Sequence, residues 1–208
     1  MTLIRKLGLA ALALAAAPAF AATTTIDFEG TTSFASVGDY YNGVGGPNWG
    51  ISFTDSALAL SNDELGPYFS HAPTNGTVMF AADAPTIMNV AAGFTGELSF
   101  WYSAPASELD VVTIYGGANG TGAELGSVSI SKNAQLGGCT DSAYCNWQRI
   151  TLSFTGTAQS VSFGGVGNAA FDNITVNTVS AVPEPATFGM LAFGLAGMMV
   201  VARRQRRS

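Results

Sequence analysis

The stretch that decides the fold reads Leu-Ser-Phe-Trp-Tyr-Ser at residues 98–103. Large apolar side chains occupy every second position, Leu98, Phe100 and Tyr102, while the two serines and Trp101 occupy the others. Successive side chains of a β-strand point to opposite faces of the sheet. The stretch is therefore expected to form a strand with one strongly apolar face, which needs a second layer of structure to cover it.

The same period of two recurs on both sides of this stretch. Ile150, Leu152 and Phe154 alternate with polar residues, for example, and glycine-rich segments such as 116–122 interrupt the runs. No amphipathic helix of useful length is indicated. The pattern predicts an all-β fold, a jelly-roll-like β-sandwich of about nine or ten strands. They are drawn from runs near residues 24–28, 51–54, 57–60, 77–81, 87–91, 97–103, 110–115, 124–130, 147–155, 158–163 and 170–177.

Four segments resemble those of small exported jelly-roll proteins. They read IDFEG (26–30), YYNGVGGPNWGISF (40–53), VVTIYGGANGTG (111–122) and AFDNITV (170–176). The resemblance implies a fold similar to that of carbohydrate-binding modules and discoidin-like domains. It spans most of residues 22–179, which we expect to form one β-sandwich domain with a sizeable core.

The first 21 residues have the organisation of a secretory signal peptide. Arg5 and Lys6 form a basic start, an apolar stretch follows at 7–17, and small residues close the segment at Ala19 and Ala21. The apolar stretch is too short to span a membrane, so we expect export and cleavage after Ala21. A retained N-terminal anchor is the alternative.

The last segment, residues 180–208, has three parts in a fixed order after a short linker. An extended Pro-Glu-Pro precedes the apolar run 186–202, which as a helix reaches about 25 Å and so approaches the span of a bilayer core. The arginine cluster that follows is expected to stay on the cytoplasmic side. One interpretation is a plain tail anchor. The residues of the motif are Pro183, Glu184, Pro185, Arg203, Arg204, Arg206 and Arg207.

The order of these parts resembles the PEP-CTERM sorting signal of Gram-negative bacteria. The resemblance implies that an exosortase, a membrane transpeptidase-like protease, processes the chain near Pro183-Glu184-Pro185. It also implies a transient stay in the inner membrane, followed by transfer to the cell surface or to the exopolysaccharide matrix. Such a segment specifies a destination and not an activity.

The charge of the chain is distributed unevenly. The formal net charge is −6, but residues 22–182 hold thirteen acidic side chains against only Lys132 and Arg149, a net charge of −11. So acidic a domain repels phosphate backbones, which argues against nucleic acid as a partner. It suits divalent cations.

Few residues could support catalysis. His71 is the only histidine, and no nucleophile motif surrounds it. The glycines of 116–122 lack the lysine and the following helix of a nucleotide site. Two cysteines and one remote histidine make no recognisable zinc ligand set. We therefore expect a protein without enzymatic activity.

Cys139 and Cys145 are the only cysteines, and they lie between two expected strands. An exported chain meets an oxidising compartment, so we expect a structural disulfide that closes one loop. A ring this short stabilises the fold by about 2 kcal/mol in the loop-entropy relation. It would stiffen the loop that presents Tyr144, Asn146 and Trp147.

Acidic residues are the best metal candidates. Asp27 and Glu29 are two apart, so we expect them on one face of the first strand, and Asp172 opens the last strand. Oxygen ligands of this kind suit Ca²⁺. The resemblance to carbohydrate-binding modules implies a structural calcium held by Glu29 and Asp172, with Asp27 as a weaker addition. The alternatives are solvated strand-end acids and, less favoured, the acid–base pair of a glycosidase.

Aromatic side chains beside the loops are candidate sugar platforms, because sugar faces stack on flat, exposed rings. The candidates are Tyr40, Tyr41 and Trp49 around a glycine-rich loop, and Tyr144 and Trp147 at the disulfide loop. The alternative for these side chains is ordinary burial in the core of a sandwich.

Together these features predict an exported, surface- or matrix-associated protein without enzymatic activity. A carbohydrate-associated binding module of the exopolysaccharide matrix is the favoured interpretation. A purely structural matrix or surface protein without a small ligand is the alternative, and a secreted glycoside hydrolase is a less favoured one.

Overall fold

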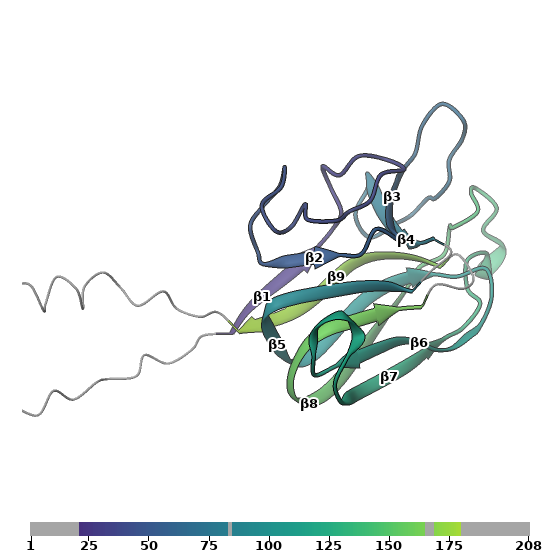
Figure 1. Ribbon diagram of the computed structural model, residues 1–208. Helices are drawn as coiled ribbons and strands as arrows, with labels where there is room; N and C mark the ends of the chain where they lie inside the picture. The colour runs from purple at the N-terminus through teal and green to yellow at the C-terminus, as the bar shows by residue number, and fades with distance from the viewer. Residues whose placement is uncertain (1–20, 83–84, 165–168, 180–208) are drawn as a thin grey trace, which may run out of the picture. The chain divides into compact units, whose positions relative to one another are not determined.

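The computed structural model describes residues 21–82, 85–164 and 169–179 (Figure 1). Within them the chain is almost entirely strand and turn, which confirms the all-β prediction. Two short 3-10 turns, η1 (Ala118–Gly120) and η2 (Leu136–Gly138), accompany the strands. The strands are β1 (Ala21–Ile26), β2 (Ile51–Phe53), β3 (Ala57–Ser61), β4 (Thr77–Ala81), β5 (Thr86–Ser103), β6 (Glu108–Tyr115), β7 (Glu124–Ile130), β8 (Gln148–Phe163) and β9 (Ala170–Val179).

The described strands belong to one antiparallel hydrogen-bonded network. Its order is β3-β4-β9-β5-β8-β6-β7, with β1 also paired to β9 and β2 also paired to β5. The second half of β5 pairs with β9, and its first half pairs with β2. Because β5 and β8 are long and bend, the network curls into two facing layers that share these two strands (Figure 1).

The bends lie at glycines with positive φ angles. In β5 the register against β8 shifts twice between residues 89 and 97, where Gly93 has a φ of 77°, and in β8 Gly156 has a φ of 96°. A bulge of this kind bends a strand without ending its hydrogen-bonded ladder. The sequence pattern predicts two short strands at each of these places, and the structure instead joins each pair into one long strand.

The core lies between the two layers. Leu98, Phe100 and Tyr102 are buried there, which confirms the alternation predicted for this strand. The ring centroid of Phe100 lies 6.0 Å from that of Phe163 on β8 and 5.8 Å from that of Phe171 on β9. Burial of each such ring stabilises the fold by about 1.5–3 kcal/mol.

The other face of β5 is covered as well. Trp101 packs in a second, smaller apolar cluster together with Phe69, from the loop between β3 and β4, and Trp147, from the segment that precedes β8. Two loops thus fold over the outside of this layer. Ser99 and Ser103, which share this face with Trp101, are buried as well.

The two ends of the described domain lie side by side. Ala21, at the start of β1, pairs with Val179, at the end of β9. Residues 1–20 of the predicted signal peptide, and the whole predicted sorting segment at 180–208, lie outside the described residues. No helix in the part of the chain that the structure describes is long and apolar enough to cross a membrane.

Candidate functional site

Loops from three parts of the chain gather at the end of the domain opposite the paired Ala21 and Val179. They are the turn after β1 (27–31), the loop between β3 and β4 (62–76), and the disulfide loop before β8 (139–145). The loop 62–76 contacts both of the others and protrudes from its layer in Figure 1. We call this region the loop end.

Asp172, the third residue of β9, is a fully buried carboxylate at the loop end. Its Oδ2 accepts a hydrogen bond from the backbone N–H of Thr74 at 3.0 Å, and its Oδ1 accepts one from the N–H of Asn173 at 2.7 Å. Burial raises the pKa of Asp172 to about 7, against the effect of these two hydrogen bonds, and the negative charges of Glu29 and Asp27 raise it further.

Asp27 and Glu29 follow β1 instead of lying on it, because the strand ends at Ile26. The expected shared strand face is therefore corrected to a turn, in which Phe28 has a φ of 61°. Glu29 Oε1 accepts a hydrogen bond from the backbone N–H of Thr77 at 3.1 Å. Asp27 Oδ1 accepts one from the N–H of Glu29 at 3.2 Å.

Close packing holds the Glu29 carboxylate in place. The carboxylate lies directly against the backbone of Gly76, where an added Cβ atom would meet it. Burial raises the pKa of the Tyr41 phenol above its ordinary value, and the nearby negative charge of Asp27 raises it further. Within the described residues, none of the three carboxylates forms an ion pair with a basic side chain. These three acids, which we call the acid cluster, have no basic partner among the described residues, but their oxygens are not placed closely enough together to share a metal ion.

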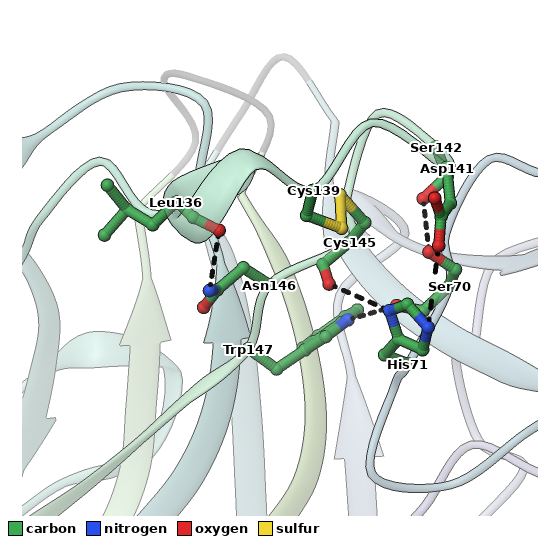
Figure 2. Close-up of a disulfide and its surroundings, with 9 residues drawn as sticks. All are labelled: Ser70, His71, Leu136, Cys139, Asp141, Ser142, Cys145, Asn146 and Trp147. Carbon is green, nitrogen blue, oxygen red and sulfur yellow. Dashed lines mark hydrogen bonds and ion pairs between the residues drawn. A yellow bond between two sulfur atoms is a disulfide. The ribbon is translucent and has the colours of Figure 1, made fainter.

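Cys139 and Cys145 form the predicted disulfide, with an S–S distance of 2.05 Å (Figure 2). The loop that it closes is docked against the loop 62–76. The N–H of Ser70 donates to the carbonyl oxygen of Tyr144 at 3.0 Å, and Trp147 Nε1 donates to the carbonyl oxygen of Ser70 at 3.0 Å. The disulfide loop therefore holds the segment that leads to Thr74 and the Asp172 carboxylate.

His71, in the loop 62–76, packs against the disulfide loop. The sequence did not indicate this contact. His71 Nε2 is 3.6 Å from Asp141 Oδ2, and its Nδ1 is 3.3 Å from the carbonyl oxygen of Cys145 (Figure 2). His71, Asp141 and Cys139 offer possible metal-ligand atoms within 4.8 Å of one another. The Cys139 sulfur is engaged in the disulfide, so this group is not a ligand set in the oxidised protein.

A pocket of about 530 Å³ opens beside this loop. Its lining combines amides, a hydroxyl, an imidazole and two apolar side chains. Asn62 keeps the loop closed, because its Oδ1 accepts from the N–H of Tyr68 and its Nδ2 donates to the carbonyl oxygen of Phe69. The lining residues are Asn62, Pro67, Phe69, Ser70, His71, Asn75 and Gly76. No periodic pattern marks them in the sequence.

Only part of the predicted aromatic set is accessible. Trp49 is 41% exposed and stacks on Tyr41 with ring centroids 5.2 Å apart and planes 16° apart. Tyr41 is only 1% exposed, so its ring supports Trp49 from beneath and cannot meet a ligand. Trp147, at 9%, is buried in the second apolar cluster, and Tyr144 is half-buried against that cluster. The expectation of exposed rings is thus corrected for Tyr41 and Trp147.

Tyr40 continues this aromatic group and borders a second pocket. Its ring meets Tyr41 edge-on at 5.0 Å and lies against Gly30 and Gly46, where an added Cβ would come within 2.4–2.5 Å of the tyrosine side chain. The pocket of about 370 Å³ beside it is lined by backbone, hydroxyls and one carboxylate. The lining residues are Gly30, Thr31, Thr32, Ala35, Ser36, Val37, Gly38, Asp39, Tyr40, Val44 and Gly45.

Solved structures with a similar fold include several sugar-binding domains. A family 6 carbohydrate-binding module of Clostridium stercorarium, in complex with cellobiose, is 12% identical with a TM-score of 0.39, and the match covers 61% of this chain and 86% of that one. The xylan-binding family 22 module of Paenibacillus barcinonensis is 10% identical with a TM-score of 0.43 (80% and 100% covered). A cleaved adhesin domain of Lys-gingipain from Porphyromonas gingivalis is 14% identical with a TM-score of 0.43 (76% and 99%).

One protein family matches the C-terminal segment of the chain. No curated protein matches the sequence. Residues 181–207 match the family described as the PEP-CTERM protein-sorting motif. The chain therefore carries a PEP-CTERM sorting motif, which implies export and membrane-anchored sorting, and joins it to an all-β domain of the sandwich type.

Proposed function

We propose that the described domain is a non-catalytic carbohydrate-binding module of a surface-sorted protein. The observation that carries the proposal is the Trp49 indole, 41% exposed and held flat by the buried Tyr41 ring behind it. One face of the indole is used for packing and the other is open. A flat apolar surface held rigidly in this way suits the apolar face of a sugar ring, because little conformational entropy is lost on binding.

Hydrogen-bonding groups lie beside Tyr40, whose ring meets the Tyr41 ring that supports Trp49. The pocket of about 370 Å³ that Tyr40 lines also presents Thr31, Thr32, Ser36 and Asp39, whose hydroxyls and carboxylate can pair with sugar hydroxyls. A net charge of −11 across residues 22–182 repels uronic acids and sulfated sugars. A neutral polysaccharide is therefore the proposed ligand class, and the exopolysaccharide of the cell surface or matrix is its proposed source.

A glycoside hydrolase is the less favoured alternative, and the burial of Asp172 argues against it. A catalytic carboxyl group must reach the glycosidic oxygen or the sugar carbon. Asp172 has no exposed surface, and both its oxygens accept backbone hydrogen bonds. The acid cluster is better suited to a structural role at the loop end.

We also propose that this acid cluster holds a structural Ca²⁺ ion. Glu29 and Asp172 would supply carboxylate oxygens, with Asp27 as a further ligand, and the ion would provide the missing counter-charge. Hard oxygen donors without a basic partner suit such an ion, which would have to draw the three carboxylates closer together than they lie here. Its chemical contribution would be to neutralise the cluster and so fix the loop end, with no step in any reaction.

The proposed route to the surface follows from the sorting motif. An exosortase would cut the chain near Pro183-Glu184-Pro185 after export across the inner membrane, and the β-domain would then pass to the cell surface or matrix. In this account the motif delivers the protein and the loops of the domain retain it there.

A glycan array probed with the full-length protein in detergent tests the proposed function. Retention on one or more neutral polysaccharides, without loss of the glycan over time, is the expected result. Failure to bind any glycan would favour a purely structural matrix protein. Release of shorter sugars would favour the hydrolase.

A further inference from the structure

Exposed apolar side chains are concentrated in one segment of the sequence. Six large hydrophobic residues are strongly exposed in the described domain, and four of them lie between residues 30 and 69: Phe34, Val44, Trp49 and Leu65. The other two are Leu109 and Leu136. Apolar groups gathered on one face mark a binding surface, whereas isolated ones do not.

Phe34 is an exposed aromatic residue with a strained backbone conformation. Its side chain is 54% exposed, and its φ of 57° lies in the left-handed region that bulky residues rarely adopt. The ring meets Tyr68 edge-on, with centroids 5.7 Å apart and planes 88° apart. Glycine would relieve the strain, and an exposed ring contributes little to the core. A role in binding accounts for an aromatic residue at this position.

Phe34 and Tyr68, whose rings are in contact, come from the two segments that line the two pockets. The segment around Phe34 is hydrogen-bonded to the end of β3, since the N–H of Phe34 donates to the carbonyl oxygen of Ala59 at 2.8 Å and the N–H of Ser61 donates to Ser33 Oγ at 3.0 Å. Phe34 itself lines neither pocket, but Thr32 and Ala35 on either side of it in the sequence line the smaller one. Tyr68 likewise lies between Pro67 and Phe69, which line the larger one. We call the Phe34–Tyr68 pair the aromatic ridge.

The chemistry of the two pockets is alike. Each combines hydroxyls or amides and glycine backbone with apolar side chains, and neither contains a lysine or arginine. Groups of this kind suit the hydroxyls of a neutral sugar, and the ridge offers apolar ring surface between them. A phosphate-rich or uronate chain would find no lysine or arginine in these two linings, and the imidazole of His71 already lies beside the Asp141 carboxylate.

We infer that the domain binds an internal run of a neutral polysaccharide, with sugar units in both pockets and across the aromatic ridge. This inference rests on the proposed carbohydrate-binding function and adds that the site is extended. A single terminal sugar would use one pocket only. A chain that crosses the ridge uses both pockets and buries the strained Phe34 ring.

Calorimetry with sized oligosaccharides tests this inference. The probe is the neutral exopolysaccharide of the producing cells, partially hydrolysed and separated by length, and the protein is the full chain in detergent. Affinity is expected to rise with length beyond the disaccharide. Phe34→Gly should weaken binding of the long oligosaccharides by about fivefold or more, the effect of one lost ring contact, and leave the disaccharide unaffected.

The controls separate binding from folding. Phe34→Gly relieves the positive φ, so its melting temperature should equal or exceed that of the parent. Phe34→Trp should keep the affinity, and Leu109→Ala, which removes an 87% exposed side chain from β6, should leave it unchanged.

Two outcomes would overturn the inference while leaving the proposed function intact. They are affinity that stops rising at the disaccharide, and equal binding by Phe34→Gly and the parent protein. If no oligosaccharide of any length binds, both the proposed function and the extended site are wrong. A change of oligomeric state in Phe34→Gly without sugar would assign the ridge to a protein contact and overturn the inference as well.

Discussion

The buried Asp172 carboxylate accepts a 3.0 Å hydrogen bond from the backbone N–H of Thr74, 98 residues earlier in the chain. Through this contact the last strand holds the loop that connects β3 and β4. Glu29, after the first strand, holds the end of the same loop through the N–H of Thr77. The first and last strands are thus both fixed to the β3–β4 connection by a carboxylate, Glu29 after β1 and Asp172 on β9.

Stability without metal should fall as the pH rises. The pKa of Asp172 is raised to about 7 in the folded protein, above the ordinary aspartate value, so the folded state binds its proton more tightly than the unfolded state. The free energy of unfolding should therefore decrease between about pH 4 and pH 7, by on the order of 4 kcal/mol, and then level off. Denaturant melts in chelator across this range measure the slope. Asp172→Asn should flatten it, and an unchanged slope in that variant contradicts the assignment.

Calcium should stabilise the protein most where Asp172 is ionised. A ligand that binds only the folded state raises the melting temperature by mass action, and protons compete with it below about pH 7. Ca²⁺ is therefore expected to raise the melting temperature more at pH 8 than at pH 5.5. Glu29→Gln should reduce this rise, whereas Glu124→Gln, an exposed acid on β7, should not. Melting curves that coincide with and without chelator at pH 8 would rule out the ion.

Loss of the disulfide should loosen the loop end before the core. Cys139→Ser with Cys145→Ser is expected to cost about 2 kcal/mol of unfolding free energy, because the short ring no longer restricts the unfolded chain. Hydrogen exchange should show faster opening around Ser70, whose N–H donates to Tyr144, with little change at Phe100. Uniform loss of protection through the core would contradict this local role. In the parent protein, thiol labelling under denaturing conditions should find no free cysteine.

The sorting motif should be removed from the mature protein. The match at residues 181–207 implies exosortase processing, so protein released from the cell surface should lack the arginine cluster, with the cut near Pro183-Glu184-Pro185. Intact-mass measurement of the released form checks this. A mass that still includes Arg203 and the residues after it would identify the segment as a plain tail anchor.

Much of the fold could be predicted from the sequence because a strand that is buried on one face carries an apolar residue at every second position. The alternation at Leu98, Phe100 and Tyr102 predicts the face that packs against the opposite layer, and the disulfide follows from the export signal. The sequence could not show that β5 and β8 are each one long strand. A glycine such as Gly93 or Gly156 is equally compatible with a turn that ends a strand and with a bulge that bends it. Local pattern does not distinguish a strand that ends from one that bends.

The site was less accessible because it is built from irregular loops. Tyr41 and Trp49 flank the same glycine-rich loop, yet one ring is buried under the other, and no period in the sequence separates them. The contacts of His71 with the disulfide loop depend on folding of distant segments. The exposed Phe34 at positive φ could not be recognised from sequence at all, since aromatic residues favour extended strands.

The affinity of Trp49 variants for the exopolysaccharide of the producing cells tests the central claim most directly. Trp49→Leu keeps an apolar cover over Tyr41 but removes the flat indole face, and Leu109→Ala is the matched exposed control. With full-length protein of unchanged melting temperature, the account predicts retention weakened about fivefold or more in Trp49→Leu and unchanged in Leu109→Ala. Equal retention of Trp49→Leu and the parent protein, or no retention of the parent, would contradict carbohydrate binding at this surface.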